Sequence, residues 1–125
     1  MPGVLIVDDD AAVREVFTDV FEGDPRFSVA GQAKDGREAV EAAARLQPDA
    51  IILDHQMPVM TGVQALPELR RLAPNSIVVV LSGGPEAETE RLALEAGADA
   101  FFPKNTRISQ LISCLLELLA RPRRV

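Results

Sequence analysis

The sequence has no tryptophan and no tyrosine, and it has only one cysteine. With Cys114 alone, the chain cannot form an internal disulfide, which is typical of proteins in a reducing compartment. No apolar run approaches the roughly 20 residues that a membrane-spanning helix needs. The N-terminus lacks a basic region and soon reaches Asp8, which argues against a signal peptide. These absences predict a soluble cytoplasmic domain with no membrane contact.

Positive charge is also scarce, because 13 Lys and Arg residues stand against 19 Asp and Glu residues and the net charge is −6. Direct binding of nucleic acid is therefore not expected, since phosphate contacts need clustered basic side chains. A chain of 125 residues with 47% hydrophobic content can form one domain with a real core. We expect that domain over residues 1–120, followed by a basic tail or linker stub at 121–125.

Four short apolar runs each end abruptly at a polar residue. They are Val4–Val7 before Asp8, Ala50–Leu53 before Asp54, Ile77–Leu81 before Ser82, and Ala100–Pro103 before Lys104. Continuous runs bounded by turn residues are typical of buried parallel strands. A weaker strand is expected at 27–33, and helical patterns separate all the strands. The alternation predicts a doubly wound, flavodoxin-like α/β fold with five helices and a parallel sheet in the order 2-1-3-4-5.

Several residues predict where the helices begin. Asp35, with Glu38 three residues later, is typical of a capping box at the start of a helix. Gly62 is expected to precede another helix, with Pro67 in or just beyond the first turn, where a missing N–H costs least. Pro85 suits the first position of the helix that follows the fourth strand.

Acidic residues follow two strands that should be neighbours in the sheet. Asp8 and Asp9 come after the first strand and Asp54 comes after the third, at the edge where open α/β sheets bind ligands. Like charges about 4 Å apart repel by about 4 kcal/mol at an effective dielectric near 20, so such a cluster raises a pKa or recruits a cation. Three carboxylates, waters and a main-chain carbonyl of the Asp54 loop suit Mg²⁺.

Lys104 and Ser82 narrow the chemistry at this edge of the sheet. An ammonium and a hydroxyl beside a magnesium–carboxylate site can neutralise and hydrogen-bond the oxygens of a phosphoryl group. A carboxylate such as Asp54 can itself accept the phosphoryl group and become an aspartyl phosphate. The candidate catalytic residues are therefore Asp54, Lys104 and Ser82.

Four motifs in this order resemble the receiver domains of two-component response regulators, in the CheY-like superfamily. They are Val7-Asp8-Asp9, Leu53-Asp54-x-x-Met57-Pro58-x-Met60-x-Gly62, Leu81-Ser82-Gly83, and Lys104. The resemblance covers essentially the whole chain. It implies a signalling domain that catalyses its own phosphorylation and dephosphorylation and is not a conventional turnover enzyme. The phosphoryl donor would be a sensor histidine kinase, a phosphotransfer protein or a small phosphodonor.

The resemblance also implies a role for each residue of the acidic cluster. Asp54 would be the phosphoacceptor and a metal ligand, and Asp9 would bind Mg²⁺ directly. Asp8 would act largely through metal-bound water, and the main-chain carbonyl of Gln56 would be a further ligand. Lys104 would pair with the phosphoryl oxygens.

A second set of implied roles concerns the response to phosphorylation. The Ser82 hydroxyl would swing toward the phosphoryl group, and the Phe101 ring, which lacks a tyrosine hydroxyl, would follow it inward. The face built from the fourth helix, the fifth strand and the fifth helix would present the change. An output domain or a partner protein would bind there, or a homodimer would form on phosphorylation.

Two other functions stay open at the level of sequence. A small Mg²⁺-dependent phosphohydrolase of the haloacid dehalogenase type also carries an Asp-x-Asp motif after its first strand, here Asp8 and Asp10. That interpretation leaves Asp54 without a role, and the chain has no cap insertion. A phosphorylation-independent scaffold is the third hypothesis, although the site is complete. Mapping the phosphorylated aspartate separates the first two, because the receiver uses Asp54 and the hydrolase uses Asp8.

Overall fold

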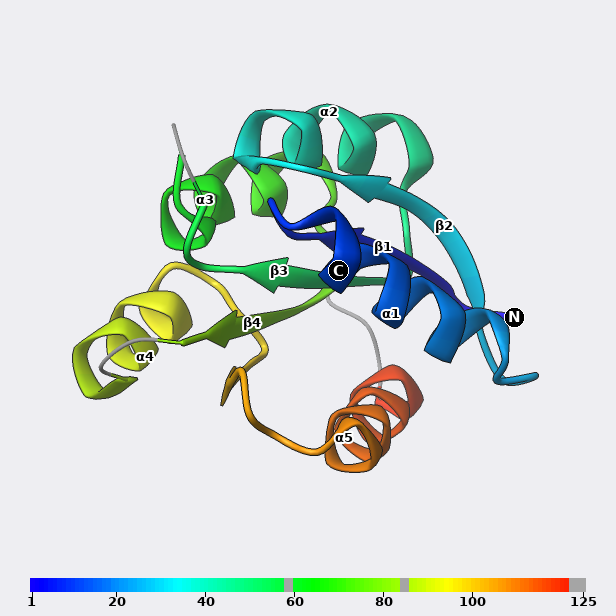
Figure 1. Cartoon of the computed structure of the whole chain (residues 1–125). Coiled ribbons are helices and arrows are strands. Elements are labelled where there is room, and N and C mark those ends of the chain that lie inside the picture. The colour runs from blue at the N-terminus through cyan, green and yellow to red at the C-terminus, as the bar shows by residue number, and fades with distance from the viewer. Residues whose placement is uncertain (58–59, 84–85, 122–125) are drawn as a thin grey trace.

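Five parallel strands form one sheet in the order β2-β1-β3-β4-β5, and helices alternate with them along the chain (Figure 1). This computed structural model describes residues 1–57, 60–83 and 86–121. The strands are β1 (Gly3–Val7), β2 (Ser28–Ala33), β3 (Ala50–Asp54), β4 (Ile77–Ser82) and β5 (Ala100–Pro103). The helices are α1 (Ala11–Glu22), α2 (Gly36–Leu46), α3 (Gly62–Leu72), α4 (Glu86–Glu95) and α5 (Ile108–Ala120). The predicted fold class, sheet order and helices are confirmed.

Helices cover both faces of the sheet (Figure 1). On one face α1 and α5 pack around Phe21, Ile52 and Leu115. On the other face α2, α3 and α4 pack around residues that include Leu53 and Leu66. Because neighbouring residues of β3 point to opposite faces, both Ile52 and Leu53 are buried, which explains why its sequence is apolar without alternation. No helix in the described ranges is long and apolar enough to cross a membrane.

The two outer strands differ from the central ones. All residues of β3 and β4 are buried, whereas β5 has no fully buried residue and β2 has one. Among the described residues, β5 pairs only with β4, and its last residue, Pro103, lies beside Ser82. A proline is tolerated there because an edge strand has no second neighbour that needs its N–H. The central strands of the sheet are therefore buried, whereas the two edge strands are largely half-buried or exposed.

One prediction about helix capping is wrong in part. Asp35 caps α2, and its carboxylate accepts a hydrogen bond from the N–H of Glu38 at 2.8 Å. The Glu38 carboxylate, however, accepts from the N–H of Lys34 at 3.0 Å, so the reciprocal bond of a capping box falls one residue early. A complete capping box begins α3 instead, where Thr61 and Gln64 exchange hydrogen bonds of 2.9 and 3.2 Å.

The helix α3 begins at Gly62 itself, one residue earlier than predicted. Pro67 therefore lies inside the helix, in its second turn, and cannot donate to the carbonyl of Val63. The Thr61 cap and the burial of Leu66 and Leu69 compensate for the missing bond. The predictions for Pro58, Pro85 and most of the 121–125 tail lie outside the described residues, and the boundary at residue 120 stays a prediction.

Candidate functional site

The acidic residues meet at the carboxyl ends of two adjacent inner strands. Asp54 is the last residue of β3, and Asp8 and Asp9 follow β1. These strands are adjacent, with Val7 opposite Leu53. One carboxylate oxygen from each of the three aspartates lies within 4.8 Å of the other two. The sheet order thus brings together the cluster that the sequence predicts.

Burial distinguishes the three carboxylates. Asp54 is 1% exposed and Asp8 is 3% exposed, whereas Asp9 lies at the surface. Asp54 Oδ1 accepts a hydrogen bond from the N–H of Gln56 at 3.1 Å and contacts the Lys104 ammonium. Asp54 Oδ2 is buried and has no hydrogen-bond partner among the residues that the structure describes. Because buried polar atoms are nearly always paired, the site is suited to a group supplied from outside the chain.

Lys104 neutralises part of this charge. Its ammonium lies 3.0 Å from Asp54 Oδ1 and 3.4 Å from Asp8 Oδ2. Its main-chain N–H donates to the Ser82 carbonyl at 2.9 Å, which fixes the lysine just beyond β5 and next to the end of β4. Burial lowers the pKa of Lys104, but the hydrogen bond and charge of Asp54 and the charge of Asp8 outweigh burial and leave it raised. The ammonium therefore stays charged.

Ser82 is the last residue of β4 and lies beside Lys104. It is fully buried, and its hydroxyl accepts a hydrogen bond from the Gln56 side-chain amide at 2.9 Å. The N–H of Gly83 donates to the oxygen of the same amide at 2.9 Å. A hollow of about 300 Å³ opens here, lined by Ser82, Gly83, Pro103, Lys104 and Asn105. There is space for a small anion beside the ammonium and the hydroxyl.

Two contacts in the site were not predicted from the sequence. The side chain of Gln56 contacts Ser82 and Gly83, and the expected role of its main-chain carbonyl as a metal ligand does not include these contacts. Arg14 of α1 donates from Nη1 to the main-chain carbonyl of Asp8 at 2.7 Å. The sequence shows a basic residue, Arg14, four positions beyond the helix cap Asp10. The direction of its side chain, however, depends on how α1 packs on the sheet.

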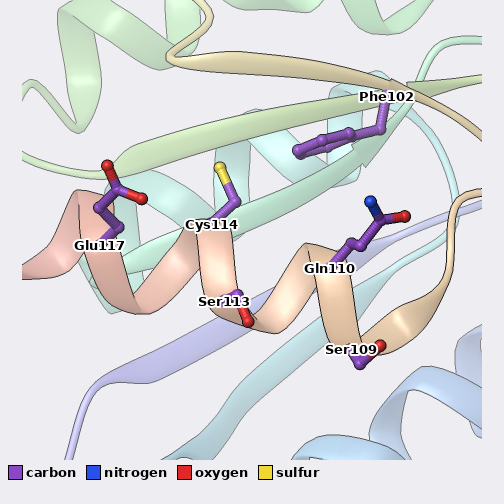
Figure 2. A pocket seen from close by; sticks show the side chains of 6 residues that line it. All are labelled: Phe102, Ser109, Gln110, Ser113, Cys114 and Glu117. Atoms are coloured by element: carbon purple, nitrogen blue, oxygen red, sulfur yellow. The ribbon is translucent and has the colours of Figure 1, made fainter.

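The two phenylalanines of β5 belong to opposite faces of the sheet. Phe101 is half-buried and packs against the cluster under α2, α3 and α4. Phe102 faces α5 and borders a second hollow of about 370 Å³, whose other lining residues are Ser109, Gln110, Ser113, Cys114 and Glu117 (Figure 2). Cys114 and Gln110 point toward the side on which Phe102 lies. Burial, with a smaller contribution from Glu117, raises the pKa of the Cys114 thiol, so the thiolate is disfavoured.

The electrostatics of Asp54 reflect its burial. Burial raises the pKa of this carboxyl from an ordinary value of 3.8 to about 6, against the opposing effect of the Lys104 hydrogen bond. The charge of Asp8 contributes to this increase. An ionised Asp54 is thus destabilising in the protein without a ligand, which favours the binding of a cation that neutralises the negative charge.

We expect this carboxyl to make the metal-free protein less stable as the pH rises from about 4 to 6. The folded-state pKa lies above the unfolded value, so the folded state binds the proton more tightly across this window and loses that advantage as the proton leaves. The shift corresponds to at most about 3 kcal/mol. Urea unfolding in a chelator, compared between wild type and Asp54→Asn at each pH, isolates the effect. Parallel pH profiles for the two proteins would contradict it.

The sequence is similar to known proteins. The family model described as response regulator receiver domain matches residues 4–116. The protein-glutamate methylesterase/protein-glutamine glutaminase 2 of Photobacterium profundum is 42% identical over 102 residues, which are 81% of this chain and 26% of that protein. A protein with the same function in its name from Treponema pallidum is 44% identical over 103 residues, again 81% and 26%. The chain spans about a quarter of the length of these curated relatives.

Solved structures show the same fold over nearly the whole chain. The response regulator domain of Thermotoga maritima CheB superposes with a TM-score of 0.89 at 32% identity, covering 98% of both chains. CheY in a CheX–CheY–BeF3–Mg²⁺ complex from Borrelia burgdorferi gives a TM-score of 0.87 at 26% identity, covering 95% of this chain and 90% of that one.

Proposed function

This chain belongs to the response regulator receiver domain family, and we propose on that basis that its phosphoacceptor is Asp54. The observation that carries the proposal is the environment of this carboxylate. It is buried, it contacts the Lys104 ammonium at 3.0 Å, and its Oδ2 has no hydrogen-bond partner in the described part of the chain. A carboxylate held in this way can act as a nucleophile toward a phosphoryl group.

Asp8, Asp9 and Asp54 would hold a Mg²⁺ ion, with the main-chain carbonyl of Gln56 as a further ligand. Three clustered carboxylates match the preference of Mg²⁺ for oxygen ligands, and the unpartnered Asp54 Oδ2 leaves a lone pair for it. When bound, Mg²⁺ would supply positive charge that neutralises phosphoryl oxygens. The Borrelia burgdorferi CheY named above, a structural neighbour, was solved in a complex with Mg²⁺ and BeF3.

The proposed reaction is one phosphoryl transfer. A carboxylate oxygen of Asp54 attacks the phosphorus and forms a P–O bond, while the bond from phosphorus to the donor atom breaks. The electron pair stays on the departing atom of the histidine kinase, phosphotransfer protein or small phosphodonor. Lys104 exchanges its contact with the Asp54 carboxylate for one with a phosphoryl oxygen, and the Ser82 hydroxyl donates to another.

Phosphorylation would then change the surface that contains α4, β5 and α5. The phosphoryl group adds about −1.5 to −2 charge at a fixed point. Ser82 and Lys104 gain contacts only in the phosphorylated state, so the population shifts toward it, and Phe101 follows. A partner protein, an output domain or a second copy of the chain would bind the altered face, where the hollow beside Phe102 lies (Figure 2).

Incubation with Mg²⁺ and acetyl phosphate is expected to add one phosphoryl group, and peptide mapping after borohydride reduction should place it on Asp54. Chelation of Mg²⁺ should prevent the gain in intact mass, because the acidic cluster would then repel the donor. Label on Asp8 with steady release of phosphate would support the phosphohydrolase, which the comparisons do not favour. If the protein gains no phosphoryl group and releases no phosphate, the result would support the scaffold.

A further inference from the structure

The side chain of Gln56 bridges the ends of two adjacent strands. Gln56 lies just after β3, whereas its two side-chain partners, Ser82 and Gly83, lie at the end of β4. Its main-chain N–H also donates to Asp54 Oδ1 at 3.1 Å. One residue thus contacts both the acceptor carboxylate and the strand end that carries the hydroxyl.

The chemistry of the partners fixes the orientation of this amide. The main-chain N–H of Gly83 can only donate, so the amide oxygen must face it and the NH₂ group must face Ser82. In a flipped amide the NH₂ group would face the Gly83 N–H, and two donors cannot form a hydrogen bond. Because both bonds are 2.9 Å long and come from one planar group, they set the position of the Ser82 hydroxyl and the Gly83 N–H together. Gln56 itself is exposed, so this attachment lies on the solvent side of the buried hydroxyl.

We propose that the Gln56 side chain is a clamp that holds the end of β4 in its unphosphorylated position. The inference rests on the proposed function, in which the Ser82 hydroxyl moves to a phosphoryl group on Asp54. That movement breaks the contact with the exposed amide and strains the bond to Gly83. The clamp therefore opposes the phosphorylated conformation, and Gln56 acts as a positioning residue rather than a catalytic one.

The test compares binding of beryllofluoride, a phosphoryl mimic, in the presence of Mg²⁺. Gln56→Met keeps the side-chain length and the main-chain carbonyl but removes both hydrogen bonds. It is expected to bind beryllofluoride about five- to tenfold more tightly than wild type, as the loss of two partly exposed hydrogen bonds in one state implies. In a Ser82→Ala background the gain should shrink, because no hydroxyl has to leave the amide. Gln64→Met, which alters the exposed amide at the start of α3, is the matched control and should leave the affinity unchanged.

Equal or weaker binding by Gln56→Met would overturn the clamp. A second measurement does not depend on the phosphoryl chemistry: hydrogen exchange of the Gly83 amide in the unliganded protein should accelerate several-fold in Gln56→Met. Unchanged exchange would also overturn the clamp. Failure of the proposed function looks different, because wild type would then not bind beryllofluoride or Asp54→Asn would bind it equally well.

Discussion

Asp54→Asn is expected to show no gain of phosphoryl mass under conditions that fully modify the wild type. The asparagine amide is a far weaker nucleophile than a carboxylate, and it removes one of the three charges that would hold Mg²⁺. The substitution is nearly isosteric at a buried position, so the fold should persist. Intact mass after incubation with Mg²⁺ and acetyl phosphate measures the loss, and circular dichroism confirms that the variant is folded.

Asp10→Asn is the matched control for this experiment. Asp10 is the third carboxylate of the Asp8–Asp10 run, but its side chain caps α1 by accepting from the N–H of Ala12 at 2.9 Å. Asparagine is an equally good N-cap, so full phosphorylation is expected. The haloacid dehalogenase alternative makes the opposite prediction, since it needs Asp8 and Asp10 and assigns nothing to Asp54. If Asp54→Asn gains phosphoryl mass and Asp10→Asn does not, the receiver mechanism is therefore rejected.

Gly62→Ala is expected to lower the free energy of unfolding by about 2–3 kcal/mol. A Cβ atom at this position would lie 2.6 Å from the main-chain oxygen of Asp54 and 3.0 Å from His55 Cα. Both are main-chain atoms, so no side-chain rotation relieves the overlap, and either α3 or the end of β3 must move. Urea denaturation monitored by circular dichroism gives the change.

Gly83→Ala tests whether the effect at position 62 is specific. A Cβ atom there would lie 3.7 Å from Lys104 Cδ and 3.9 Å from Gln56 Oε1, which are ordinary van der Waals distances. The expected change is within about 0.5 kcal/mol, as for other exposed substitutions. Similar losses at both glycines would show that flexibility of the glycine backbone, and not the close approach of α3 to β3, accounts for the result.

The core of the site could be predicted from sequence because it depends on strand ends. Once the four apolar runs and the weaker strand are interpreted as parallel strands, their carboxyl ends must share one edge, and the sheet order makes β1 and β3 neighbours. Topology alone then places Asp8, Asp54 and Lys104 at the same edge of the sheet. The structure adds the distances from the Lys104 ammonium, which are 3.0 Å to the Asp54 carboxylate and 3.4 Å to the Asp8 carboxylate.

The parts that sequence reasoning missed depend on side-chain direction. Nothing local distinguishes Gln56, whose amide contacts β4, from a solvent-exposed loop glutamine. Nor does the spacing of Asp35 and Glu38 indicate that the second hydrogen bond goes to Lys34. Such contacts depend on rotamers that tertiary packing selects. The contribution of Phe101 to the response stays a prediction, because it concerns a second conformation.

The difference in burial between the central strands and the edge strands has a consequence for how such a domain can diversify. The carboxylates stand on β1 and β3, each of which has a strand on both sides, whereas Lys104 follows β5, which has one. Substitutions on the outward surfaces of β5 and α5 would therefore alter the face that we propose binds a partner, without disturbing the acidic residues. We expect gene duplicates of such a domain to acquire new partners through changes there while they keep one inherited reaction.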